Sequence, residues 1–291
     1  MAATLGYLAI LEVPGFSIFK MVGAWGETRA LAGFKDPNVY AAYLVPAILY
    51  SFHKLQFATR KLHVFSWSFV FGFLLANQFL GFSRAAYLNI FSASIIFCFL
   101  TKIYSANKLL RASIGLLMSL SFLILTFLLR PGLLSRHVER FYSSDTSYSC
   151  VVGLASPVFT EYDVIRFEVQ RQIMFAILQN PWGIGPGRTE KVFGCAAHNL
   201  FLRIFIENGW VAGLCFLVFL GISLWHVLRV MQIYTGEKRS ERAVLASALL
   251  GVLLNSLFID TLHWRHFWLL LGLVWGADTV EVREGEESGE K

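Results

Sequence analysis

Charged residues are scarce in this chain. Asp, Glu, Lys and Arg make up 15% of its 291 residues, whereas hydrophobic residues make up 56%, and phenylalanine alone occurs 27 times. The mean hydropathy is +0.58. A soluble domain of this length needs more charge on its water-facing surface than this composition supplies. The composition therefore excludes an ordinary soluble enzyme and indicates a protein whose solvent is lipid.

Cysteines are few, and patterns typical of a metal site are absent. The four cysteines show neither a CxxC motif nor a Cys/His ligand spacing, so we expect no metal ion and no cofactor. Cys98 and Cys215 lie in apolar runs, where a packing role is expected. Cys150 and Cys195 lie in one long polar loop. If that loop is extracytoplasmic, a disulfide and two free thiols are both open alternatives.

Two other signals are missing. The first ten residues are apolar but lack a basic region, so we do not expect a cleavable signal peptide. The glycine-rich run 181–188 follows no strand, and no Gly-Lys-Ser/Thr comes after it, which excludes a nucleotide-binding P-loop.

Long apolar runs are abundant. A helix needs about 20 apolar residues to cross a bilayer core of about 30 Å, and runs of this kind favour helices over alternating barrel strands. The sequence predicts an all-α fold, a polytopic transmembrane helical bundle of seven or eight spans. Residues 1–19 form the eighth segment, broken or interfacial, and the other seven lie at 37–53, 62–82, 85–104, 111–129, 199–225, 243–260 and 266–280.

The net charge of +6 comes from basic residues grouped in short connections. Such groups face the cytoplasm by the positive-inside rule, so we expect no nucleic acid partner. The opposite face then receives residues 20–36, the Ser83-Arg84 turn, the loop 130–198 and the turn 260–265. We expect one transmembrane domain over 1–280 and an acidic cytoplasmic tail over 281–291.

The loop 130–198 is the one predicted connection large enough for a site. Residues 162–179 predict an amphipathic helix with Thr160 as its N-cap and an apolar stripe of Ile165, Val169 and Ile173. Asn180-Pro181 ends this helix, and the glycines that follow let the backbone approach another backbone or an anion closely.

Ionisable residues at membrane depth are functional candidates, because burying them is costly. Arg84 lies between two apolar runs, His198 begins the fifth predicted span, and Arg203 and Glu207 follow inside it with i, i+4 spacing. Structural alternatives stay open for each. Arg84 can extend to the interface from a helix end, His198 can cap a helix, and Arg203 with Glu207 can be a structural ion pair.

Three more arginines lie in the loop. Arg166 and Arg171 belong to the predicted amphipathic helix, where charges are ordinarily a solvated face. Arg188 ends the glycine-rich run and, like Arg136 and Lys191, has the pattern of an ordinary loop charge.

Three sequence blocks nevertheless resemble a known family. Residues 166–188, 197–202 and 207–214 are similar to the signature region of the O-antigen ligase and polymerase family. Residues 33–38, the Ser83-Arg84 pair and residues 260–268 add to the resemblance. Family members carry several more helices upstream, so we expect a shortened or truncated relative.

The resemblance implies a C-type glycosyltransferase of the inner, or plasma, membrane, with its active site on the periplasmic or outer face. Such an enzyme transfers a glycan from a polyprenyl pyrophosphate carrier to an acceptor hydroxyl, with inversion and without a metal ion. The acceptor is a lipid A core, a glycan or a protein, and membrane lipids surround the enzyme. The family's functional residues correspond here to Arg84, Arg166 and His198.

These residue types suit that chemistry. Guanidinium groups bind pyrophosphate oxygens through charge-assisted hydrogen bonds, so Arg84 and Arg166 are expected to stabilise the leaving group. A neutral imidazole at His198 suits a general base that deprotonates the acceptor. The absence of a DxD motif agrees with a metal-free reaction. Further substrate-binding candidates are Arg171, Arg188, Asn199, Arg203 and Glu207.

Two different functions compete with this prediction. A transporter or flippase component for a lipid-linked glycan would place ionisable residues of the spans along a pathway, but the polar residues are concentrated in one loop. An inactive, truncated family member would serve only as a scaffold. The sequence does not separate ligase from polymerase or from protein glycosylation, because acceptor choice depends on loop shape.

Overall fold

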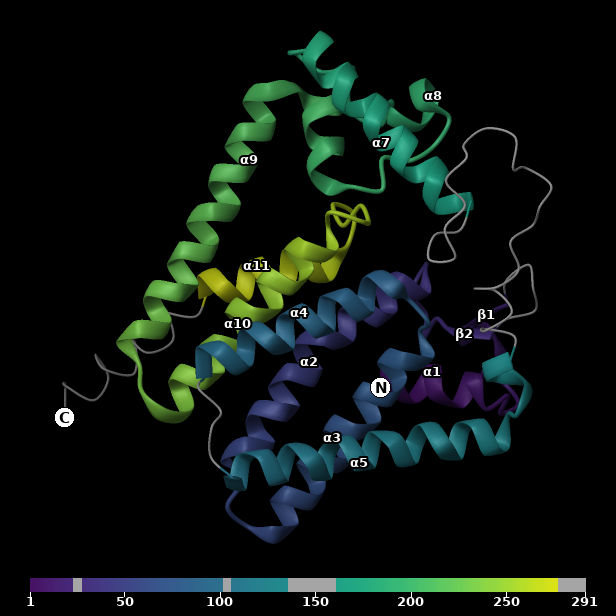
Figure 1. The fold of residues 1–291 in the computed structure, drawn as a ribbon, viewed down its shortest axis with the longest axis vertical. Helices are drawn as coiled ribbons and strands as arrows, with labels where there is room; N and C mark the ends of the chain where they lie inside the picture. Colours follow the sequence, from purple (N-terminus) through teal and green to yellow (C-terminus); the bar gives the residue numbers. More distant parts are fainter. Residues whose placement is uncertain (23–27, 102–105, 136–160, 277–291) are drawn as a thin grey trace.

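The computed structural model describes residues 1–22, 28–101, 106–135 and 161–276, and these are mostly helical (Figure 1). This agrees with the predicted all-α class. The described helices are α1 (Ala2–Ile10), the 3-10 turn η1 (Ser17–Phe19), α2 (Pro37–Phe57), α3 (Lys61–Leu80), α4 (Arg84–Thr101), α5 (Ala106–Leu129), α7 (Glu161–Gln179), α8 (Thr189–Phe193), α9 (Leu200–Ile233), α10 (Gly236–Asn255) and α11 (Arg265–Gly276).

One short β-hairpin departs from the all-helical prediction. Strands β1 (Lys20–Val22) and β2 (Thr28–Ala30) pair antiparallel, with Lys20 opposite Ala30. Three-residue strands are too short to leave an alternating pattern in a sequence. In the segment 1–19, α1 has nine residues and is too short to cross a bilayer.

Four described helices are long and apolar enough to cross a membrane: α3, α4, α5 and α9. The other three predicted spans also form helices, which are α2, α10 and α11, but they do not meet that criterion. α11 has only 12 residues, whereas α2 and α10 contain several buried polar side chains. By this criterion the structure supports four spans, compared with the seven or eight that the sequence predicts.

The packing explains why α2 and α10 are less apolar. α10 packs against α4, α9 and α2, and α2 also contacts α3 and α5, so both helices lie within the bundle. Their polar groups therefore meet protein instead of lipid. His53 Nδ1, for example, lies 2.9 Å from Ser240 Oγ across the two helices. Interhelical hydrogen bonds of this kind satisfy polar groups that hydrocarbon could not.

The outer surface of the bundle is apolar. α5 presents a row of exposed aliphatic side chains there, which suits a lipid-facing helix. Cys98 and Cys215 are also exposed, so the packing role expected for them is wrong. Cys150 lies outside the described residues. The exposed side chains of α5 are Leu109, Leu110, Leu116, Leu117, Leu120, Ile124, Leu125, Leu128 and Leu129.

α9 is divided by a sharp turn, which Figure 1 shows near the top of the molecule. Its 34 residues would measure about 50 Å if they were continuous, well beyond a bilayer core. Gly209 interrupts the helix with φ 82° and ψ 178°, a conformation that strongly favours glycine. The predicted span 199–225 is therefore not one straight helix, and residues 200–208 form a separate short segment below α7.

Candidate functional site

The helix predicted over residues 162–179 is present as α7, although Phe167, Phe175 and Leu178 on it are exposed. Val169 and Ile173 are buried and pack with Ala197 and Ile206 in a small hydrophobic cluster apart from the main core. This cluster holds α7 against the first turns of α9. The predicted cap Thr160 and the loop charge Arg136 lie outside the described residues.

The glycine-rich run joins α7 to the break in α9 through backbone contacts. Ile184 N donates to Ile206 O (2.8 Å), Gly185 N donates to Glu207 O (3.0 Å), and Trp210 N donates to Pro181 O (2.9 Å). These bonds satisfy groups that the helix break leaves without intrahelical partners. The glycines predicted to approach another backbone closely therefore do so.

Gly183 and Gly209 have no room for a side chain. A Cβ on Gly183 would lie 2.6 Å from Glu207 O and 2.6 Å from Gly209 N, and one on Gly209 would lie 2.7 Å from Pro181 O. Both glycines also have positive φ.

We expect Gly183→Ala and Gly209→Ala each to destabilise the protein by about 2 kcal/mol or more, because strain and backbone overlap act together. Thermal unfolding of the purified chain in detergent measures the effect. Gly221→Ala is the matched control on α9, since no atom lies within 4 Å of its Cβ position. Equal unfolding temperatures for all three variants would contradict the close contact between the glycine-rich run and the break in α9.

His198 lies between the glycine-rich run and the start of α9 in the sequence. Its backbone has a left-handed conformation with φ 47°. Non-glycine residues rarely adopt this region, and such outliers gather at functional sites. Gln170 Nε2 donates to the His198 carbonyl (3.2 Å), which ties the residue to α7. Burial and the positive charge of Arg166 lower the pKa of His198, while Asp260 and Asp36 oppose that shift. The imidazole is therefore neutral at neutral pH.

Asn199 fixes the start of α9. Its Oδ1 accepts from Leu202 N (3.0 Å) as an N-cap, and its Nδ2 donates to Leu257 O (3.0 Å). Leu200 N donates to Ser256 O (2.9 Å), so the connection between α10 and α11 is bonded to the same turn. Both Oδ1 and Nδ2 of Asn199 thus make hydrogen bonds within the protein.

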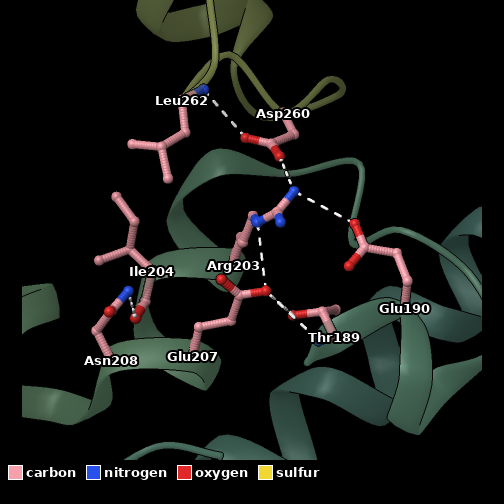
Figure 2. A network of polar contacts seen from close by, with 8 residues as sticks. All are labelled: Thr189, Glu190, Arg203, Ile204, Glu207, Asn208, Asp260 and Leu262. Atoms are coloured by element: carbon pink, nitrogen blue, oxygen red, sulfur yellow. Dashed lines mark hydrogen bonds and ion pairs between the residues drawn. The ribbon is translucent and has the colours of Figure 1, made fainter. Parts of the chain in front are cut away.

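Arg203 lies at the centre of an acidic cluster, shown in Figure 2. Its guanidinium forms an ion pair with Asp260, and lies 3.4 Å from Glu190 Oε1 and 3.4 Å from Glu207 Oε1. The side chains of Arg203, Asp260 and Glu207 are 10%, 11% and 4% exposed. The expected i, i+4 pair is therefore present, within a larger network.

Glu207 also connects this cluster to α8. Its Oε1 accepts from Thr189 Oγ1 (2.7 Å), and Thr189 N lies 3.4 Å away. Asp260 Oδ1 accepts from Leu262 N (3.0 Å), which fixes the turn before α11. Arg203 thus connects α8, α9 and the turn before α11 through ion pairs, as Figure 2 shows. The sequence-based candidates did not include Thr189, Glu190 or Asp260.

Arg84 lies at the start of α4, exposed, after a turn in which Phe82 has φ 45°. Arg29, which was not among the sequence-based candidates, supports this turn. Arg29 is 5% exposed, and it donates from Nε to Gly81 O (3.0 Å) and from Nη2 to Asn38 Oδ1 (3.1 Å). Arg29 thereby joins the Pro-Asn segment at the start of α2 to the Ser83-Arg84 turn.

Two predicted binding residues lie apart from these contacts. Arg171 is exposed, and both its Nε and Nη2 donate to Glu168 (2.9 and 2.7 Å). Arg188 is exposed beside the glycine-rich run, with its side chain over Gly185. The described contacts join neither arginine to His198 or to the Arg203 cluster.

The described residues thus define a helical membrane protein with a basic and acidic site at one end of its bundle. The family model for O-antigen ligases matches residues 69–217, about half of the chain. This range includes Arg84, Arg166, His198, Arg203 and Glu207. The chain therefore belongs to the O-antigen ligase family. No curated protein and no solved structure matches it.

Proposed function

We propose that this protein is a membrane glycosyltransferase that moves a glycan from a polyprenyl pyrophosphate carrier to an acceptor hydroxyl. Family membership supports a membrane enzyme that transfers glycans. The transfer from a pyrophosphate carrier is supported by one observation above all. A neutral, half-buried His198 lies just before the start of α9, where the positive charge of Arg166 acts on it.

His198 acts as the general base in this proposal. The acceptor hydroxyl donates its proton to the neutral imidazole as its oxygen attacks the anomeric carbon. The bond between that carbon and the pyrophosphate oxygen breaks, and the electron pair leaves with the pyrophosphate. Attack opposite the leaving group inverts the configuration at the anomeric carbon. The strained backbone and the bond from Gln170 fix the orientation of the histidine.

Arg166 and Arg84 stabilise the negative charge that develops on the leaving pyrophosphate, a role that needs no metal ion. Arg166 is half-buried on α7, and its charge acts on His198. Arg84 lies at the same end of the bundle, in the turn that Arg29 supports. Arg171 and Arg188 are exposed enough to contact the glycan or the acceptor, whereas Asn199, Arg203 and Glu207 position the site.

We further propose that α2, α10 and α11 cross the inner membrane together with the four apolar helices, and that His198 faces the periplasm. Contacts at the other end of the bundle support this arrangement. Lys54 on α2 pairs there with Glu237 on α10 (2.9 Å), and Arg111 on α5 donates to Gln56 O (2.6 Å). The basic residues between helices thus gather at the end opposite His198, in agreement with the positive-inside rule.

Complementation tests the proposed function. A strain lacking its O-antigen ligase or polymerase receives wild type, Arg84→Ala or Arg166→Ala at matched membrane abundance, and its glycans are separated on a gel. We expect wild type to restore long glycan and both substitutions to reduce it at least tenfold, because each removes a charge-assisted contact with the leaving group. A ladder of increasing length on the carrier would identify a polymerase, and glycan on the lipid A core a ligase.

Lys191→Ala is the control for loss of one positive charge, because Lys191 is an exposed residue of α8. With purified components, activity in the presence of EDTA tests the proposed independence from metal ions. Wild type that inserts stably and restores no glycan in either strain would contradict the proposal, as would full activity of both arginine variants.

A further inference from the structure

A cavity of about 370 Å³ lies at the end of the bundle opposite His198. The end of α2, the end of α4, the start of α5 and the connection from α9 to α10 surround it. This volume falls within the range of small-molecule sites. The family resemblance and the proposed transferase reaction give it no role. Its lining residues are Gln56, Phe57, Leu100, Thr101, Lys108, Thr235, Gly236, Arg239 and Ser240.

Two cations line this cavity without a carboxylate partner among the described residues. Lys108 and Arg239 are both half-buried, and the ion pairs of the described chain include neither. The Lys108 ammonium instead lies 5.1 Å from the centre of the Phe57 ring. Glu237, a carboxylate at the start of α10, is paired with Lys54 at 2.9 Å. Among the described residues, the cavity therefore carries a positive charge that no carboxylate offsets through an ion pair.

A buried amide provides an independent sign of a ligand. Gln56 lines the cavity and is 4% exposed, yet neither its Nε2 nor its Oε1 has a hydrogen-bond partner in the described structure. The backbone carbonyl oxygen of Gln56 accepts from Arg111 Nη1 (2.6 Å), which holds this end of α2 in place. Buried polar side chains are rarely left without partners, so an amide next to two cations that have no described carboxylate partner indicates a site for a polar anion.

We propose that this cavity binds the phosphate-bearing headgroup of an anionic membrane lipid. Lys108 and Arg239 bind the phosphate, and the Gln56 amide donates to it or to the polar group that the phosphate carries. Apolar surface continues from Phe57 and Leu100 in the wall of the cavity.

The apolar surroundings favour a lipid over free phosphate. Leu109 and Leu110 follow Lys108 on α5 and are 55% and 61% exposed, on the surface that faces lipid. An acyl chain can therefore lie along α5 while its headgroup enters the cavity. Basic pockets between helices on the cytoplasmic side are typical sites for anionic lipid headgroups.

Native mass spectrometry of the full chain tests this site. Adducts are counted with phosphatidylglycerol, phosphatidylcholine or inorganic phosphate at equal concentrations. We expect phosphatidylglycerol to bind at least tenfold more tightly than phosphatidylcholine, and Lys108→Gln/Arg239→Gln to reduce that affinity at least tenfold. Arg60→Gln/Lys61→Gln is the matched control, because it removes two exposed charges at the same end outside the cavity.

Gln56→Leu is a second variant, which removes the amide at similar size and should also weaken binding. Equal affinity in wild type and the Lys108/Arg239 double variant would overturn the site, and so would an equal loss in the Arg60/Lys61 control. Inorganic phosphate that binds as tightly as phosphatidylglycerol would identify free phosphate as the ligand and overturn the lipid assignment. Binding is measured without glycan transfer, so the outcome does not depend on the proposed enzymatic function.

Discussion

His198→Ala is expected to lower the rate of glycan transfer by about 10² to 10⁴, the usual contribution of a general base. The alanine variant should keep the abundance and unfolding temperature of wild type, because the hydrogen bond that Gln170 donates goes to the backbone carbonyl of residue 198, which alanine retains. Transfer by purified protein in detergent measures the effect. His63→Ala is the control, since His63 is exposed on α3. Unchanged transfer by His198→Ala would exclude the imidazole as the base.

The same histidine should set the pH dependence of transfer. Burial and Arg166 both lower its pKa below the ordinary value of about 6.5. The neutral base therefore persists on the acid side of neutrality, and the rate should fall only as pH drops below that value. Arg166→Gln removes one cause of the lowered pKa, so the acid limb of its residual activity should move to higher pH. If the fall in rate at acid pH occurs at the same pH in Arg166→Gln as in wild type, a titratable group other than His198 controls the pH dependence.

Local patterns in the sequence predicted most of the helices. Each of the seven apolar segments contains a helix, and the helix predicted over residues 162–179 coincides with α7. These patterns depend on neighbours three or four residues apart, which a sequence displays directly. The number of membrane spans was harder to predict. α2 and α10 bury polar residues inside the bundle, so the hydropathy of these helices does not show whether they lie in the membrane.

The partners of the site residues could not be predicted from local patterns. The pair Arg203 and Glu207 was visible as i, i+4 spacing, but Asp260 is 57 residues away from Arg203. Arg29 is likewise 52 residues from Gly81, whose carbonyl it binds. Only the fold brings such residues together, and a single sequence holds no signal for them. The glycines of 181–188 indicated a close backbone approach without indicating that its partner is the break in α9.

Arg203→Ala is expected to destabilise the protein by about 3–5 kcal/mol, the usual cost of breaking a buried ion pair by removing one partner. The substitution leaves Asp260 and Glu207 largely buried without their shared cation. It also removes the ion pairs that join α9 to Glu190 on α8 and to Asp260 before α11, which Figure 2 shows. Membrane abundance and thermal unfolding in detergent measure the loss.

Arg171→Ala is the matched control, because it breaks an exposed pair with Glu168 on α7 and should leave the unfolding temperature unchanged. In the double variant Arg203→Ala/Asp260→Asn, part of the lost stability should return, since the uncompensated carboxylate is removed as well.

The comparison with His198→Ala separates positioning from chemistry. His198→Ala should be stable and inactive, whereas the folded fraction of Arg203→Ala should keep a larger share of the transfer rate. If Arg203→Ala is as stable as wild type and loses transfer completely, the positioning role is wrong. The guanidinium of Arg203 must then contact the glycan or its carrier. Arg203 would in that case be a substrate-binding residue, as the sequence predicts.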